Sequence, residues 1–388
     1  MLNAGLRLWE TQKSQGTGLC IGLDPHYDSH GPLNEAFYRQ YATRDHRVYS
    51  YFKSVIEGMP KMKLANIFDH DRVIMFLAGV ARYMAEVADT AWHEGIRVFK
   101  PQIAHYERLH PFGMMLLGII CQGTRWHVAE TVQKCFLILD CKRGDIAESQ
   151  APYYEAYLTD LDKEVFPGSY GQFGFDVMTV TTWMGEDVLT PGLPFFRNGK
   201  GAIVVTRSSN PSGTTFQDAL VHNDDELEVS GAQEPFCLTP EVLMRVEDLL
   251  GKSHCSAHEV MLYLTSEFSR KHDLDEEGVS PLFSVMGSTV KMESAFRELR
   301  PGGIALVPGF GAQEGQFANV MPLVATAGVL EGHLGILSSS RAHNYPWMEK
   351  YGGSGDPKQL KSDMARAIAA FRKQEKEAYA AYGIAYPF

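Results

Sequence analysis

Short apolar runs recur along the chain, each bounded by Gly, Pro, Asp or Ser. Their apolar residues are continuous rather than alternating, which predicts strands covered on both faces, as in a parallel sheet. Eight such runs occur, at residues 19–23, 96–99, 135–139, 175–180, 202–206, 282–286, 304–307 and 334–337.

The segments between these runs carry apolar residues three and four positions apart, which predicts amphipathic helices. The clearest cover residues 71–92, 111–133 and 148–161, and residues 358–379 resemble a final helix rich in Ala and Lys. Eightfold alternation of strand and helix predicts an α/β fold, a (β/α)8 TIM barrel. A doubly wound open sheet is the alternative that periodicity alone leaves open.

Two gaps between strand runs are much longer than one strand–helix unit, one from Leu19 to Ile96 and one from Ala202 to Leu282. A minimal barrel needs roughly 250 residues, and the chain has 388. We therefore expect a single barrel domain over residues 1–388, with two long, mainly helical insertions at about 26–95 and 214–280. Residues 34–59 form the most helix-like part of the first insertion.

Charge and composition exclude several classes of protein. The formal net charge is −11, which argues against a nucleic-acid binder, since such proteins need a basic face. No apolar stretch approaches the roughly 20 residues of a membrane-spanning helix, and the N-terminus lacks a secretory signal. The six scattered cysteines are typical of reduced thiols, so we expect a cytoplasmic protein without disulfides.

Polar residues follow most of the predicted strands. In a parallel barrel these strand ends open onto one face, where active sites are built. The segments are Asp24-Pro25, Lys100-Pro101-Gln102, Asp140-Cys141-Lys142-Arg143-Gly144-Asp145, Thr181-Thr182, Ser208-Ser209-Asn210-Pro211, Pro308-Gly309-Phe310-Gly311-Ala312-Gln313 and Ser338-Ser339-Ser340-Arg341.

The sharpest of these segments follows the third strand. Asp140 and Lys142 are two residues apart, so in an extended chain they point the same way. With Lys100 and Asp145 they would form an alternating row of cations and anions. A purely structural ion-pair network is the alternative, but the position at the functional face and a Lys able to deliver a proton favour catalysis.

The turn that begins at Pro308 is rich in Gly, and barrels often hold phosphate after the last two strands. Gln313 can donate from its amide, and Arg341 offers two parallel donors. These residues predict a phosphate site. The cluster of His254, Cys255 and His258 lacks a second ligand pair at zinc spacing, so we expect no metal site there.

Taken together and in order, these segments resemble the orotidine 5′-phosphate decarboxylase family, and the stretches around Lys100 and Asp140 resemble its longer bacterial subgroup most. The resemblance implies a (β/α)8 barrel, a carboxy-lyase that makes UMP from orotidine 5′-monophosphate without a cofactor, and a homodimer with a shared active site. It implies no nucleic-acid or membrane partner.

The resemblance also implies residue roles. Lys142 would protonate C6 of the pyrimidine, beside Asp140 at the departing carboxylate. Lys100 and Asp24 would hold the ribose, and Asp145 would reach into the partner's site. The remaining contacts would come from Ser149, which also reaches across, from Ser209 at the pyrimidine edge, and from Pro308, Gln313 and Arg341 around the phosphate.

Two departures concern the loops: Thr181-Thr182-Trp183-Met184-Gly185 replaces the subgroup's usual turn, and Glu314 follows Gln313 where Gly is usual. Two alternative functions stay open. One is a Mg2+-dependent sugar-phosphate decarboxylase or aldolase of the same superfamily, in which the metal would stabilise an enediolate. The other is a nucleotide-binding protein that has lost catalysis.

Overall fold

The computed structural model describes residues 2–44, 46–58, 69–129, 135–164, 173–221, 240–287, 295–309, 317–326 and 328–388. Within them, eight parallel strands form a closed barrel in the order β1-β10-β9-β8-β5-β4-β3-β2. The strands are β1 (Leu19–Gly22), β2 (Val98–Lys100), β3 (Phe136–Arg143), β4 (Val177–Val180), β5 (Gly201–Arg207), β8 (Leu282–Met286), β9 (Ala305–Pro308) and β10 (Gly335–Ser339). Each overlaps one predicted run, so the barrel is confirmed and the open sheet is wrong.

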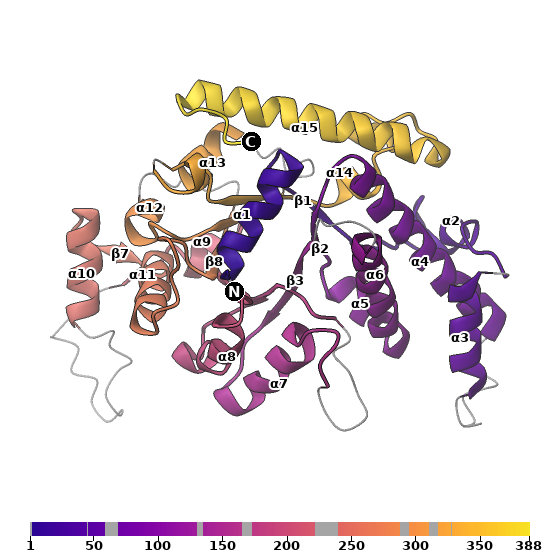
Figure 1. Ribbon diagram of the computed structural model, residues 1–388, viewed down its shortest axis with the longest axis horizontal. Coiled ribbons are helices and arrows are strands. Elements are labelled where there is room, and N and C mark those ends of the chain that lie inside the picture. The colour runs from indigo at the N-terminus through magenta and orange to yellow at the C-terminus, as the bar shows by residue number, and fades with distance from the viewer. Residues whose placement is uncertain are drawn as a thin grey trace.

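Helices surround the barrel (Figure 1). The longer ones are α4 (His70–His93), α6 (Pro111–Ala129), α7 (Ala147–Leu158), α11 (Ala257–Lys271), α13 (Phe317–Val324) and α15 (Leu360–Tyr382). The short helices α5 (Ala104–Glu107), α8 (Leu193–Phe196), α9 (Gly213–Phe216), α12 (Ala295–Leu299) and α14 (Arg341–Asn344) lie between them in the chain. Of the predicted helices, α7 ends three residues early and the last residues predicted for α6 lie outside the described part.

The two long gaps carry additional elements. The first holds α2 (Glu35–Arg39) and α3 (Arg47–Gly58) before α4. Both α2 and α3 fall within the helix-like stretch expected at residues 34–59, as two helices that each pack on α4. The second gap holds α10 (Pro240–Leu250) and a short antiparallel pair, β6 (Leu220–Val221) with β7 (Cys255–Ser256).

The N-terminal helix α1 (Ala4–Gln15) closes the barrel at the end where the strands begin. Its apolar residues Ala4, Leu6 and Leu8 pack with the inward-facing side chains of the strands, which include Cys20, Val98, Phe136, Ile138, Val177, Ile203, Phe283 and Ile336. Arg7 pairs with the buried Asp176, 2.5 Å away, just before β4. The helix thus covers the end where the strands begin, and the opposite end carries the polar residues expected in the site.

No helix among the described residues is both long and apolar enough to cross a membrane. Five of the six cysteines lie in the described part, and none of these five forms a disulfide.

The C-terminal helix α15 packs on α4 and α13 along the outside of the barrel (Figure 1). Its buried Glu375 accepts hydrogen bonds from Thr17 Oγ1 at 2.6 Å, the Gly18 amide at 2.9 Å and Tyr386 Oη at 2.9 Å. These bonds tie the end of the chain to the start of β1. Burial raises the pKa of Glu375 to about 7, although the three donors oppose the rise.

Since folding raises the pKa of Glu375, the folded protein binds the extra proton more tightly than the unfolded chain. The contribution of protonated Glu375 to the free energy of unfolding is complete below the pKa that Glu375 has in the unfolded chain. It is lost as pH rises through about 7. At about 1.4 kcal/mol per pKa unit, the loss amounts to about 3 kcal/mol. We expect Glu375→Gln to flatten the decline of the melting temperature between pH 5 and pH 8. Glu377→Gln, at an exposed position of the same helix, should leave the decline unchanged; identical pH profiles for all three proteins would contradict the assignment.

Candidate active site

Three charged residues expected in the row meet at the carboxyl ends of β2 and β3. Nζ of Lys100 lies 3.2 Å from Oδ2 of Asp140, and Nζ of Lys142 lies 2.5 Å from Oδ1 of the same carboxylate. Lys100 is buried, whereas the side chain of Lys142 is 45% exposed. Lys142 is therefore the member of this group that an incoming ligand can touch most directly.

The two buried groups, Asp140 and Lys100, each favour the charged form of the other. Burial disfavours the Asp140 carboxylate, but Lys100 and Lys142 outweigh that effect and hold its pKa below the usual range. Burial also disfavours the Lys100 ammonium, but Asp140 and Asp24 outweigh it and raise the pKa of Lys100. Thr179 Oγ1 adds a hydrogen bond to Asp140 Oδ1 at 3.0 Å. At neutral pH the site therefore holds alternating charges before any ligand arrives.

The backbone between Asp140 and Lys142 is not the extended chain that the sequence predicts. Lys142 has φ 47°, in the left-handed region that few non-glycine residues adopt, and the pairing of β3 with β4 shifts register here. Thr179 Oγ1 holds the distortion by accepting the amide hydrogens of Cys141 and Lys142, both at 2.8 Å. The bulge thus aims Lys142 at Asp140, and such strain is common at functional sites.

Asp24 follows β1 and is buried beside the same opening. Its Oδ1 accepts the Gln102 amide at 2.8 Å, and its Oδ2 accepts Ser340 Oγ at 2.5 Å. These contacts link the loops after β1, β2 and β10 through one carboxylate. Gly22 is required just below, since a Cβ there would lie 2.8 Å from Ser340 Cβ.

Asp145 does not join the row, contrary to the sequence-based expectation. Its Oδ1 accepts the Ile146 amide at 2.8 Å, and none of the ion pairs among the described residues includes it. Ser149 is exposed on α7, two residues after that helix begins. Both residues come after the bulge at Lys142 in the chain.

The other expected residues lie at the ends of β5, β9 and β10. Ser209 is half-buried after β5, Pro308 ends β9, and Arg341 is exposed in the first turn of α14. The amide of Gly309, which has φ 100°, donates to the Ser338 carbonyl at 3.2 Å and joins the last two loops. Gln313 lies outside the described residues, as does Glu314.

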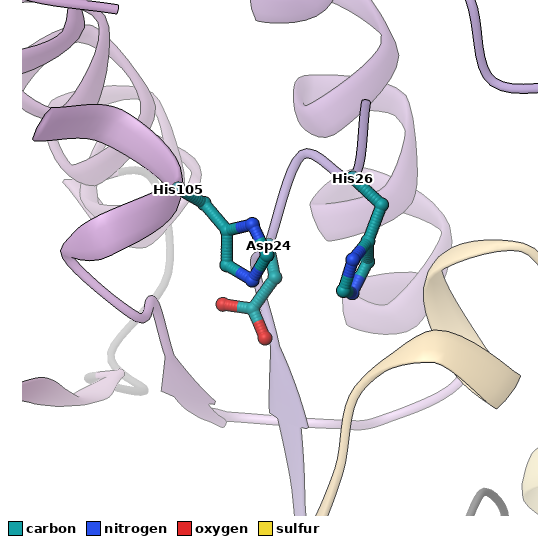
Figure 2. A group of neighbouring side chains, drawn as sticks. All are labelled: Asp24, His26 and His105. Atoms are coloured by element: carbon teal, nitrogen blue, oxygen red, sulfur yellow. The ribbon is translucent and has the colours of Figure 1, made fainter. Parts of the chain in front are cut away.

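Two histidines that were not predicted from the sequence lie beside Asp24. His26 follows Asp24 by two residues, and His105 lies in α5. Figure 2 shows Asp24 beside the two imidazole rings, whose centroids lie 4.4 Å apart. The two histidines are far apart in the chain, and the only available signal was that each follows a strand end.

Two residues of the His254, Cys255 and His258 cluster make structural contacts. His258 is buried, with Nδ1 at 3.0 Å from Ser256 Oγ and 2.9 Å from the Gln217 carbonyl. Cys255 is buried in β7. In the part of the chain that the structure describes, these residues do not gather as metal ligands.

Comparison with known proteins points to one enzyme. No protein-family model matches the chain. Orotidine 5′-phosphate decarboxylase from Rhodopirellula baltica is 28% identical over 267 residues, which is 68% of this chain and 74% of the relative. The enzyme of that name from Caldicellulosiruptor bescii is 27% identical over 323 residues, covering 82% of this chain and 83% of the relative.

Solved structures agree on the fold. Orotidine 5′-monophosphate decarboxylase from Plasmodium berghei superposes with a TM-score of 0.61 at 14% identity, covering 97% of this chain and 98% of that one. The OMP decarboxylase of Leishmania donovani gives a TM-score of 0.55 at 16% identity, covering 96% of this chain and 99% of that one. This chain is similar in sequence to the orotidine 5′-phosphate decarboxylases, and it shares the barrel fold of the solved ones.

Proposed function

We propose that the protein converts orotidine 5′-monophosphate to UMP and CO2, a step of pyrimidine biosynthesis. The observation that carries the proposal is the Lys100–Asp140–Lys142 arrangement at the open end of the barrel. Direct decarboxylation breaks the bond from C6 to the carboxylate and leaves the electron pair on a carbon without an adjacent electron sink. An ammonium fixed beside that carbon stabilises the developing charge.

Lys142 is the proton donor in this proposal. As CO2 leaves, an N–H bond of Lys142 breaks and its proton forms the new C6–H bond; the resulting amine regains a proton from water. Asp140 holds Lys142 in place through their contact at 2.5 Å. The negative charge of Asp140 also repels the substrate carboxylate, and departure of CO2 relieves that repulsion.

The remaining residues bind the parts of the substrate that do not react. Lys100 and Asp24 hold the ribose hydroxyls, and Ser209 contacts the pyrimidine edge. Pro308, Gln313 and Arg341 surround the phosphate. Binding energy from this remote group positions the pyrimidine against Lys142.

Arg341→Ala tests the phosphate contact. An ionic hydrogen bond contributes about 1.5–3 kcal/mol, so we expect kcat/KM for orotidine 5′-monophosphate to fall by about ten- to a hundredfold. Turnover of orotidine, which lacks the phosphate, should change by less than about threefold in the same variant. Arg270→Ala, which removes an exposed Arg paired with Glu267, is the matched control. Equal losses on both substrates would refute the phosphate role.

A homodimer with a shared site is the second part of the proposal, and an exposed apolar patch supports it. We call Ile146, Trp183, Met184 and Phe216 the apical patch; these residues follow β3, β4 and β5. The side chains of Trp183 and Phe216 are 69% and 56% exposed, with ring centroids 5.0 Å apart. Exposed aromatic groups of this kind are typical of protein interfaces.

The apical patch is next in the chain to Asp145 and Ser149, which do not pair with the Lys100–Asp140–Lys142 group. Asp145 precedes Ile146 directly, and Ser149 lies in the first turns of the helix that follows. A second copy seated on this patch would cover it, and Asp145 and Ser149 would then face the other protomer's site. A twofold contact repeats this arrangement at both sites.

The direct test of the activity is spectrophotometric. Purified protein is mixed with orotidine 5′-monophosphate in EDTA, and the loss of orotate absorbance is followed with formation of UMP. We expect rapid conversion. Absence of conversion together with Mg2+-dependent turnover of a sugar phosphate would favour the sugar-phosphate alternative. UMP binding without conversion would favour a non-catalytic protein.

A further inference from the structure

Asp24, His26 and His105 bring three metal-ligating side chains to one point beside the open end of the barrel (Figure 2). Their ligand atoms all lie within 4.8 Å of one another. Two loops supply them, and β1 and β2 hold these loops side by side through the pairs Ile21–Phe99 and Gly22–Lys100. Small side-chain rotations would bring the three atoms to the spacing of ligands around one ion.

The donor atoms are available. His26 Nε2 is buried, and it has no hydrogen-bond partner in the described structure. Each Asp24 oxygen accepts one hydrogen bond and keeps a lone pair.

Surrounding contacts fix the loop that carries His26. Its amide donates to Tyr345 Oη at 2.8 Å, and its carbonyl accepts a hydrogen bond from Tyr38 Oη. The adjacent Leu23 carbonyl accepts Tyr106 Oη at 2.5 Å, which ties this loop to α5 and hence to His105. These hydrogen bonds hold the backbone that carries the ligand side chains in place, which lowers the entropy lost on binding an ion.

The donor chemistry selects the ion. Two imidazoles and one carboxylate suit Zn2+ or Co2+ with a fourth position left to water, whereas Mg2+ and Ca2+ prefer oxygen ligands. The positive charges of Lys100, Arg108 and Arg341 act on these histidines and limit the affinity for a dication. Such a site suits a reversible ligand better than a permanently held structural ion.

We infer that Asp24, His26 and His105 form a site for a divalent transition-metal ion such as Zn2+, and that the bound ion competes with the substrate. An ion on Asp24 occupies the carboxylate that the proposed function assigns to the ribose hydroxyls. The competition therefore rests on the proposed function, whereas binding of the ion does not.

The first test uses Co2+ as a spectroscopic probe of the full-length protein after removal of metals with EDTA. We expect a tetrahedral ligand-field absorption band at one ion per chain, which Zn2+ abolishes by displacement and UMP weakens by competition. His26→Gln and His105→Phe should each remove the band, with melting temperatures in EDTA confirming that the variants fold. His93→Gln, at a histidine exposed on α4, should retain it. A band that persists in both site variants would overturn the site.

The second test measures decarboxylation at a series of buffered Zn2+ concentrations. We expect saturating Zn2+ to raise the apparent KM of the wild type at least tenfold with kcat unchanged, and to change the KM of His105→Phe less than twofold. Inhibition that lowers kcat alone would overturn the competition. A Co2+ band that depends on His105 in a protein without decarboxylase activity would instead refute the proposed function and leave the metal site standing.

Discussion

Lys142→Ala is expected to lower kcat for orotidine 5′-monophosphate by at least about ten-thousandfold, since it removes both the proton donor and the ammonium that stabilises the carbanion. The Lys100–Asp140 pair stays intact in this variant because Lys100 contacts the other carboxylate oxygen. UMP, which has no carboxylate at C6, should therefore bind within about tenfold of its wild-type affinity. Steady-state rates and a calorimetric UMP titration measure the two quantities.

Lys271→Ala is the matched control for this prediction. Lys271 is also partly exposed and paired with a carboxylate, that of Glu186, but it lies on α11 away from the strand ends. Its removal should leave kcat unchanged. Near-native turnover in Lys142→Ala would exclude Lys142 as the proton donor.

Mixed dimers of Asp145→Ala and Lys142→Ala are expected to regain activity that neither variant has alone. If Asp145 acts in the partner's site, a mixed dimer has one site with both residues intact and one with neither. Random assortment makes half of the dimers mixed, so the unfractionated mixture should reach about a quarter of the wild-type rate, and the mixed dimers alone about half. Co-expression of differently tagged chains, followed by tandem purification and assay, measures it.

Two controls separate complementation from other causes. Asp140→Ala mixed with Lys142→Ala should recover nothing, because both residues belong to the same protomer's site. Trp183→Glu in both chains should abolish the recovery by placing a charge in the apical patch, whereas Leu249→Glu, at an exposed leucine of α10, should not. A mixture that only matches the sum of its components would show that Asp145 does not act across subunits.

The barrel was predictable because a parallel strand covered on both faces leaves a continuous apolar run in the sequence. All eight runs become barrel strands, with ends displaced by at most four residues. The polar strand ends likewise predicted that Asp24, Lys100 and Asp140 share one face. These features depend on local pattern and on the fixed geometry of the fold.

The details that the sequence did not reveal depend on tertiary context. The positive φ at Lys142 falls on a residue type that carries no signal for it, and Thr179 holds the bulge from another strand. Asp145 follows the bulge by three residues, and nothing in the sequence signals the change of direction there. His26 and His105 belong to different loops, so only the pairing of β1 with β2 brings them together.

The closure of the barrel also constrains when the chain can fold during synthesis. β1, the first strand made, pairs on one side with β2 and on the other with β10, the last. Until the ribosome has released β10, β1 keeps an unpaired edge, and α1 lacks part of the surface that it covers. Contacts this distant in sequence form slowly and leave partly folded intermediates exposed to aggregation. Nascent chains truncated before Gly335 are therefore the forms of this protein that depend most on chaperones.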